Sequence, residues 1–463
     1  MPSKINSYLS KPSVLVIIAI SCFSIVTMDG WRNWHKGQHP FSWDVANYYS
    51  YLPAHFLNDG SYEFNNPNFV DNYLPICPID NKHIPKTTYG MSLMYSPFFA
   101  LGYKVALNQN DPRDGFSEPF ATVIHWGMIF YGLLSLFILR SLLRKFFSEL
   151  VTSISIIIVF LGTSLFYYSV SMPEMSHSAL FLLYSSFLLA TCNWHENQKL
   201  ISAIVIGFLI GLISLIRPTD ILIAMFFVFW PKHDISNIKE RFSFWFNNWK
   251  SILLIILTSF LIWLPQMLFW KFRTGQLLYF SYGDEGFFWG DPQVINVLFS
   301  YRKGLFVYTP LFLLAFIGLF FMKANKTLRN LIIVSIVLTT YLISCWWDWF
   351  FGGSFAARAF VQHLAYMVIP IGYLIRYVFE QPTDIRTNTW IKPIFVIIAG
   401  LGISLNLFQT KQSLEGLIHF HSMSEKTYWL VFGKLKLNEH EQSEFWNSLD
   451  VPDYDKLKKG DRD

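Results

Sequence analysis

The sequence is poor in charge and in cysteine, and it lacks the short motifs that mark nucleotide and zinc sites. Only 14% of its 463 residues are charged, against about 25% in soluble domains. Its four cysteines show no Cys-x-x-Cys spacing, which excludes a zinc ribbon or a dense disulfide framework. No Walker loop, His-Glu-x-x-His or Gly-x-Ser-x-Gly motif occurs. A reaction catalysed here would therefore take its energy from an activated substrate.

Long apolar runs are what the chain has in abundance. Hydrophobic residues make up 53% of it, and runs of the roughly 17–25 residues that cross a bilayer recur from end to end. The sequence predicts an all-α integral membrane protein with about eleven transmembrane helices. These are Pro12–Met28, Phe120–Leu139, Val151–Tyr168, Ser176–Cys192, two short helices within Leu200–Trp230, Ser251–Leu268, Leu305–Met322, Leu331–Cys345, Ala359–Tyr377 and Ile391–Phe408.

The distribution of Lys and Arg places the N-terminus in the cytoplasm and the C-terminus in the periplasm of a bacterial inner membrane. In this orientation the cytoplasmic segments hold 16 of the 36 basic residues and the short outer loops only six, as the positive-inside rule requires. We expect a transmembrane domain, residues 1–408, with a long first periplasmic loop, 29–118, and a short periplasmic tail, 409–463. The basic residues behind the net charge of +5 are distributed according to the side of the membrane. This charge gives no reason to expect nucleic acid as a partner.

The first periplasmic loop carries two patches with helical spacing. Apolar residues follow Asp44 at helical intervals up to Pro53, which must end or kink that helix. The stretch 91–107 is apolar, and we expect it to lie in the membrane interface. Its length also allows a crossing, which would invert the topology downstream. Asp44 is either a helix cap or a general base that takes a proton from an acceptor hydroxyl.

Other outer segments place ionisable residues at helix entrances. Lys86 either snorkels to the interface or holds a phosphate leaving group as a point charge. Glu174 and His177 stand three apart and are expected to share one helical face, as a helix cap or as the wall of a polar cavity. Arg217 tops the turn within Leu200–Trp230, where Asp220 is its local partner and a lipid-linked phosphate is the alternative.

Cations and tryptophans recur in the later outer loops. Arg302 and Lys303 open one predicted span, whereas Asp348 and Arg358 follow another. Tryptophan is ordinary at a membrane interface. Tryptophan next to Asp348 and a double glycine is, however, also how a sugar-binding face with a close backbone approach is built. These four residues complete the candidate substrate-binding set.

In their order and sidedness these segments resemble the GT-C superfamily of membrane glycosyltransferases, near the family-39 protein mannosyltransferases and aminoarabinose transferases. The resemblance rests on an inside N-terminus, an acidic residue on an interfacial helix of a long first outer loop, and Lys86-x-x-Tyr89-Gly before a second interfacial helix. Bacterial members look similar in three further stretches, Asp44 to Ala54, Pro173 to His177 and Ile216 to Thr219.

The resemblance implies an inverting transfer of a sugar from a polyprenyl-phosphate donor to a lipid, glycan or protein acceptor at the periplasmic face. It implies Asp44 as the general base and Lys86, with Tyr89 beside it, at the lipid phosphate. Val45 replaces an acidic residue of the family, which leaves a divalent metal and the acceptor geometry open. We expect no cofactor, and the sequence identifies no metal ligand.

The remaining candidate residues receive supporting roles in this scheme. Arg217 and Lys303 would stabilise the departing phosphate beside Lys86, an electrostatic role. Glu174 and His177 would position donor or acceptor, and the polyprenyl tail would lie between helices among the membrane lipids.

Two other classes of protein stay open. A polysaccharide polymerase or ligase also uses lipid-linked sugars, but such proteins tend to carry their large outer loop late in the chain. A transporter or flippase is the other alternative. The absence of an internal repeat, and ionisable residues at the outer face instead of the midplane, argue against it.

The predicted topology can be tested with reporter fusions. A reporter that is active only outside the cytoplasm, fused after Phe408 or at Asp463, should be active at both positions. Cytoplasmic readout at both would contradict eleven spans and would place 91–107 across the membrane.

Overall fold

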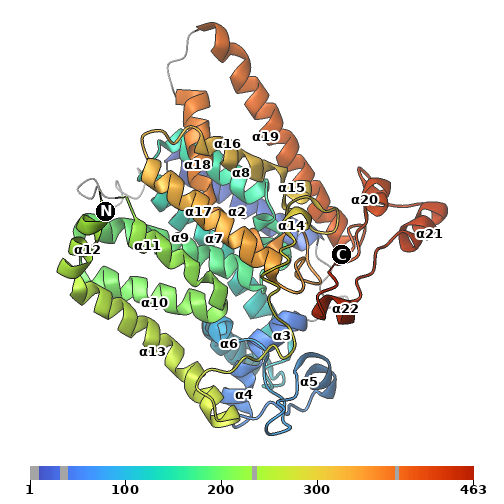
Figure 1. Cartoon of the computed structure of the whole chain (residues 1–463). Coiled ribbons are helices and arrows are strands. Elements are labelled where there is room, and N and C mark those ends of the chain that lie inside the picture. The colour runs from blue at the N-terminus through green and yellow to red at the C-terminus, as the bar shows by residue number, and fades with distance from the viewer. Residues whose placement is uncertain (1–9, 32–39, 232–236, 381–384, 463) are drawn as a thin grey trace. The chain divides into compact units, whose positions relative to one another are not determined.

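The computed structural model describes residues 10–31, 40–231, 237–380 and 385–462 (Figure 1). Within these ranges every named element is a helix, and the β-pairing consists of two isolated antiparallel bridges, Ile76 with His83 and Phe287 with Trp346. The predicted all-α class is confirmed. The chain forms two compact units. Unit 1 comprises Met1–Arg32, Leu136–Ser171 and Asp284–Asp463, and unit 2 comprises Asn33–Ser135 and Met172–Gly283.

Unit 2 contains the helices of the first outer loop and those that support the turn at Arg217. In chain order its helices are α3 (Trp43–Tyr49), α4 (Tyr51–Leu57), α5 (Pro67–Tyr73), α6 (Gly90–Gln109), the first part of α7 (Glu118–Leu143), α9 (Ser176–Asn197), α10 (Leu200–Ile216), η3 (Pro218–Ile223), α11 (Ala224–Phe229), α12 (Ile238–Asn247) and α13 (Trp249–Thr274).

Unit 1 contains the N-terminal helix, the later apolar helices and the tail. Its helices are α2 (Pro12–Trp31), the last part of α7, α8 (Glu149–Leu161), η2 (Tyr167–Ser171), α14 (Val294–Phe299), α15 (Leu305–Tyr308), η4 (Pro310–Phe312), α16 (Leu313–Leu319), α17 (Lys326–Cys345), η5 (Arg358–Phe360), α18 (Leu364–Glu380), α19 (Ile385–Leu414), α20 (Glu425–Val431), α21 (Glu439–Asn447) and α22 (Tyr454–Lys458). Because α19 continues to Leu414, the expected boundary at 408 falls inside this helix.

The prediction of eleven spans is not confirmed. Within the described residues, four helices are long and apolar enough to cross a membrane: Glu118–Leu143, Trp249–Thr274, Lys326–Cys345 and Trp390–Leu414. Several other predicted spans are interrupted. The run Val151–Tyr168 breaks where α8 ends at Leu161, with Gly162 at the C-cap position. The run Leu305–Met322 breaks at Thr309-Pro310, where proline removes one helical N–H. Hydropathy alone does not reveal these breaks.

Two helices of unit 2, α10 and α13, pack along one another and support the turn at Arg217 (Figure 1). Gly207 and Gly211 lie one turn apart on α10 and allow this close approach. A Cβ on Gly207 would lie 2.6 Å from the carbonyl oxygen of Ile255. The hydroxyl of Ser259 donates to the carbonyl of Gly207 at 2.8 Å. Small residues with this spacing are a common way for membrane helices to bring their backbones together.

The first outer loop folds as two short helices followed by a long one. The break predicted at Pro53 falls at Ser50, between α3 and α4. Pro53 therefore lies in the first turn of α4, where its missing N–H is tolerated. The second patch, 91–107, lies within the continuous helix α6, with Pro97 inside it. Helix α6 packs against α3, α4 and α10, all within unit 2.

Candidate active site

Asp44 lies half-buried in the first turn of α3. Ser42, and not Asp44, occupies the capping position of this helix, so capping does not account for Asp44. The preceding residue, Trp43, has a left-handed backbone (φ 52°) and an indole that is 74% exposed. This conformation is a genuine outlier for a bulky side chain. The carboxylate therefore stands next to a locally strained backbone, a feature that is enriched at functional sites.

The amide of Asn47, one turn after Asp44, joins α3 to the segment that carries Lys86. Its side-chain oxygen accepts from the backbone N–H of Lys86 at 2.7 Å. Its side-chain nitrogen donates to the carbonyl of Tyr73 at 2.9 Å. Asn47 is itself buried, so these bonds are shielded from water. They fix the backbone of Lys86 relative to the helix of Asp44.

The rest of the Lys86 segment is also held by specific contacts. The hydroxyl of Ser281 donates to the carbonyl of Lys86, and that of Tyr51 donates to the carbonyl of Thr87 at 2.7 Å. The Lys86 ammonium lies 5.0 Å from the centre of the Tyr282 ring, a cation–π distance. Lys86 is half-buried. The ammonium group of Lys86 is thus held in place next to the Tyr282 ring.

Tyr89 is fixed by α13 and serves as an anchor for the same segment. Its backbone N–H donates to the side chain of Gln266 at 2.9 Å, and its hydroxyl donates to the carbonyl of Ile262 at 2.5 Å. Because the phenol is used in this bond, the structure gives Tyr89 a positioning role beside Lys86.

The turn that carries Arg217 packs directly against the Lys86 segment. The hydroxyl of Thr88 donates to the carbonyl of Leu215. A Cβ on Gly90 would lie only 2.8 Å from the backbone nitrogen of Ile216, so only glycine fits at this contact. Arg217 follows immediately, half-buried at the end of α10. Two cations that are far apart in the sequence are thus carried by backbone segments in direct contact.

Glu174 lies in the turn before α9 and pairs with a histidine of α7. Its carboxylate is 2.5 Å from His125 Nδ1, and both side chains are buried. Because α9 begins at Ser176, the expectation that Glu174 and His177 share one helical face is wrong. Met175 occupies the capping position, so Glu174 does not cap the helix either. His177, in the first turn of α9, is buried.

Tyr95 on α6 connects the Glu174 turn to α3. Its hydroxyl donates to the backbone carbonyl of Glu174. Burial, the adjacent Tyr48 and the charges of Glu174 and Asp44 raise the pKa of the Tyr95 phenol well above its ordinary value. Both carboxylates therefore act on the same phenol, which places Asp44 and Glu174 in one electrostatic environment within unit 2.

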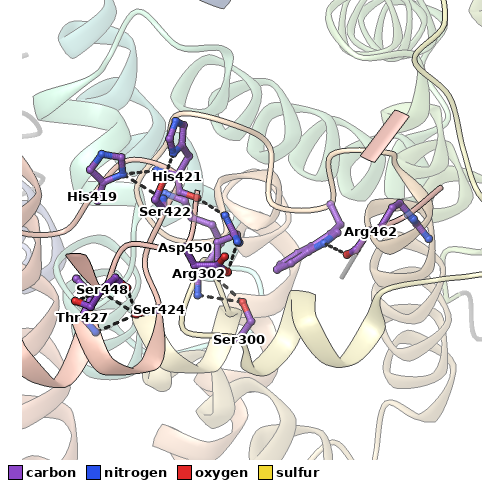
Figure 2. A network of polar contacts seen from close by, with 12 residues as sticks. Ser300, Arg302, His419, His421, Ser422, Ser424, Thr427, Ser448, Asp450 and Arg462 are labelled. Atoms are coloured by element: carbon purple, nitrogen blue, oxygen red, sulfur yellow. Dashed lines mark hydrogen bonds and ion pairs between the residues drawn. The ribbon is translucent and has the colours of Figure 1, made fainter. Parts of the chain in front are cut away.

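The other four candidates lie together in unit 1. The Lys303 ammonium is buried and donates to the carbonyl of Ser354. Burial and the nearby charge of Arg358 lower the pKa of Lys303 well below its ordinary value, while the carboxylate of Asp348 opposes this effect. Arg302 is also buried and pairs with Asp450 of the tail at 2.5 Å (Figure 2). The candidate residues are thus described as two clusters, one within each unit.

Three residues of the unit 2 cluster, Asn47, Tyr95 and His125, were not predicted from the sequence. His125 had a visible signal, because an ionisable residue inside a predicted span needs a partner. Asn47 follows Asp44 by three residues, so the two lie on one face of the helix, but nothing in the sequence indicated its contact with Lys86. No sequence signal distinguished Tyr95 from the many other aromatic residues of the outer loop.

A metal centre finds no support among the described side chains. They include no group of three or more His, Cys, Asp or Glu residues that could hold a metal ion.

Comparison with solved structures identifies the fold. The archaeal oligosaccharyltransferase AglB from Archaeoglobus fulgidus, in complex with an inhibitory peptide and a dolichol-phosphate, matches 94% of this chain and 60% of its own, with a TM-score of 0.52 and 10% identity. The Archaeoglobus fulgidus oligosaccharyltransferase in complex with Zn and sulfate matches 94% of this chain and 57% of its own, with a TM-score of 0.53 and 15% identity.

These oligosaccharyltransferases are glycosyltransferases of the GT-C superfamily, and the chain shares their fold. The expected GT-C-like fold is therefore confirmed, and the apolar helices together with these neighbours identify a membrane protein. The chain spans less than two thirds of the length of the structures it matches. No protein-family model matches the chain, and no curated protein sequence does so.

The role of Asn47 can be tested by its removal. Asn47→Ala leaves the N–H of Lys86 and the carbonyl of Tyr73 without their buried partner, and each such loss costs about 1–3 kcal/mol. We expect a lower midpoint of thermal unfolding in the purified protein. The matched control is Asn58→Ala, because the exposed amide of Asn58 bonds the carbonyls of Ser61 and Glu63 where water can replace it. Equal midpoints for the two variants would contradict the bridging role.

Proposed function

We propose that the protein is a glycosyltransferase that moves a sugar from a polyprenyl-phosphate-linked donor to an acceptor hydroxyl at the periplasmic face of the bacterial inner membrane. One observation carries the proposal. Within unit 2, a half-buried carboxylate on α3 is joined through Asn47 to a lysine segment, and that segment packs on the turn that bears Arg217. A base and two cations are what displacement of a lipid phosphate requires.

The proposed reaction is a single displacement with inversion. Asp44 takes the proton of the acceptor hydroxyl as its oxygen attacks the anomeric carbon of the donor sugar. The bond between that carbon and the phosphate oxygen breaks, and polyprenyl phosphate leaves with the electron pair. Lys86 and Arg217 stabilise the negative charge that develops on the phosphate, and Arg217 contributes a planar fork of donors that suits phosphate oxygens.

The other unit 2 residues hold this arrangement in place. Tyr89 anchors the lysine segment through Gln266 and Ile262. Glu174 is committed to His125, and its backbone carbonyl to Tyr95. We therefore propose that it and His177 position donor or acceptor only indirectly, by fixing the start of α9. We assign the phosphate to Lys86 and Arg217 and not to Lys303, because the buried ammonium of Lys303 already donates to the carbonyl of Ser354.

The fold supports a lipid-linked donor. The AglB neighbour was solved with a dolichol-phosphate and an inhibitory peptide, which are a lipid phosphate and a peptide bound by a protein of the same fold. We extend only the lipid-phosphate class of ligand to the present chain. A transporter would need no general base, so transfer activity and its dependence on Asp44 separate the two functions.

Replacement of Asp44 is the decisive experiment. Asp44→Asn keeps the size of the side chain but removes its ability to accept a proton. We expect sugar transfer in membranes to fall by about 10²–10⁴-fold, with an unchanged midpoint of thermal unfolding. Asp71→Asn, an exposed change on α5, is the matched control and should retain activity. Near-normal transfer by Asp44→Asn would exclude the general-base role.

The leaving-group site is tested by charge removal at Lys86. Lys86→Met keeps the apolar stem over Tyr282 but removes the ammonium. We expect weaker binding of a polyprenyl-phosphate sugar and an even lower turnover, because the developing phosphate charge loses a partner. Lys82→Met, at an exposed position of the same segment, is the control. Unchanged donor binding and turnover in Lys86→Met would contradict the phosphate-binding role and leave snorkelling to the interface as the role of Lys86.

A further inference from the structure

The tail of unit 1 lines a polar basin whose residues have no role in the catalytic steps proposed above. The cavity measures about 190 Å³, which is space for several waters or for one sugar ring. Its inner wall consists of Arg302, Trp349 and Phe350, and its outer wall comes from tail residues 450–462. Both walls belong to unit 1. Figure 2 shows Arg302 and Asp450 side by side, with Arg462 to one side of them.

Arg302 forms a fixed inner wall. It is about nine-tenths buried, and its guanidinium donates to the carbonyl of His421 at 2.7 Å and pairs with Asp450 at 2.5 Å (Figure 2). The same guanidinium lies 4.9 Å from the centre of the Phe350 ring. With these contacts in place, the wall needs no ordering when a ligand binds, which lowers the cost of binding.

Arg462 fastens the outer wall to the end of α17. One guanidinium nitrogen lies within hydrogen-bond distance of the carbonyls of Ser344, Cys345 and Trp346, at 3.0–3.3 Å, at the end of the helix. The other pairs with Asp291 at 3.1 Å. The carbonyl of Arg462 accepts from the indole of Trp349 at 3.2 Å. The tail is thus attached to the same tryptophan that lines the basin.

The charges that line the basin balance one another and indicate the class of ligand. Three cations and three carboxylates contribute to its walls: Arg302, Lys456 and Arg462, and Asp450, Asp453 and Asp461. An anion such as phosphate would meet the carboxylates, and a cation would meet the guanidinium groups. A neutral ligand with many hydroxyls suits both, because each hydroxyl donates to a carboxylate and accepts from a cation. Such a ligand is a carbohydrate.

We propose that this basin binds a neutral carbohydrate of about one sugar ring and, resting on the proposed function, that the acceptor of the transferred sugar is a glycan. The basin has neither a long apolar wall for a lipid chain nor an excess of positive charge for a lipid phosphate. It therefore suits the acceptor and not the donor.

The test measures sugar binding without any transfer reaction. The full chain is placed in lipid nanodiscs free of glycoside detergent. Binding of methyl glucoside, methyl mannoside, methyl galactoside and N-acetylglucosamine is followed by saturation-transfer difference NMR, with inorganic phosphate as the anionic probe. We expect at least one sugar to bind. The double variant Lys456→Gln/Asp461→Asn, which changes two exposed lining residues, should weaken its binding about tenfold or more.

The matched control is Asp455→Asn/Lys459→Gln, which makes the same two chemical changes at exposed positions outside the basin. It should bind sugar like the parent chain, with the same thermal midpoint. Three results would overturn the proposal: no binding of any sugar, equal binding by the two double variants, or phosphate binding that is lost in the lining variant. Sugar binding without transfer from polyprenyl donors would instead overturn the proposed function and leave the basin standing. Transfer to acceptors without sugar binding would overturn the carbohydrate site and leave the proposed function standing.

Discussion

The candidate active site depends on one buried side-chain amide. Asn47 accepts from the backbone of Lys86 and donates to the carbonyl of Tyr73, so the helix of Asp44, the lysine segment and α5 share one anchor. Neither Asp44 nor Lys86 lies on a long helix, and each would otherwise take its position from a loop. The amide gives two loop-borne groups a fixed separation, which acid–base and electrostatic catalysis both require.

The sequence predicted those features of the site that are local. The turn at Arg217 was recognisable because Pro218 disfavours a continuous helix next to a charged residue. The helix of Asp44 was recognisable from its apolar spacing. Pairings between distant segments were not predictable. Glu174 has several polar neighbours in the chain, yet its partner is His125 on another helix. The hydroxyl of Thr88 donates to the carbonyl of Leu215. Neither the composition nor the spacing of the sequence predicts this contact.

The prediction of eleven spans is not confirmed, and the reason is a related physical one. Hydropathy averages the free energy of transfer from water over a window of residues. The continuity of a helix, however, depends on single residues. Helix α8 ends at Leu161, and the amide of Asn406 then donates to the freed carbonyls of Leu161 and Thr163, both at 2.9 Å. A helix can stop within an apolar run because a residue from another helix satisfies its end.

The interleaving of the two units has a consequence for the order in which the protein is made. The chain passes between units after residues 32, 135, 171 and 283, so all of unit 2 leaves the ribosome before the last segment of unit 1. Helix α8 is synthesised early, but α18 and α19, which pack on it, belong to that last segment. The carbonyls of Leu161 and Thr163 at the end of α8 gain their hydrogen bonds only after Asn406 has been synthesised. The unit that carries Asp44 and Lys86 is thus complete in sequence while its companion is still unfinished.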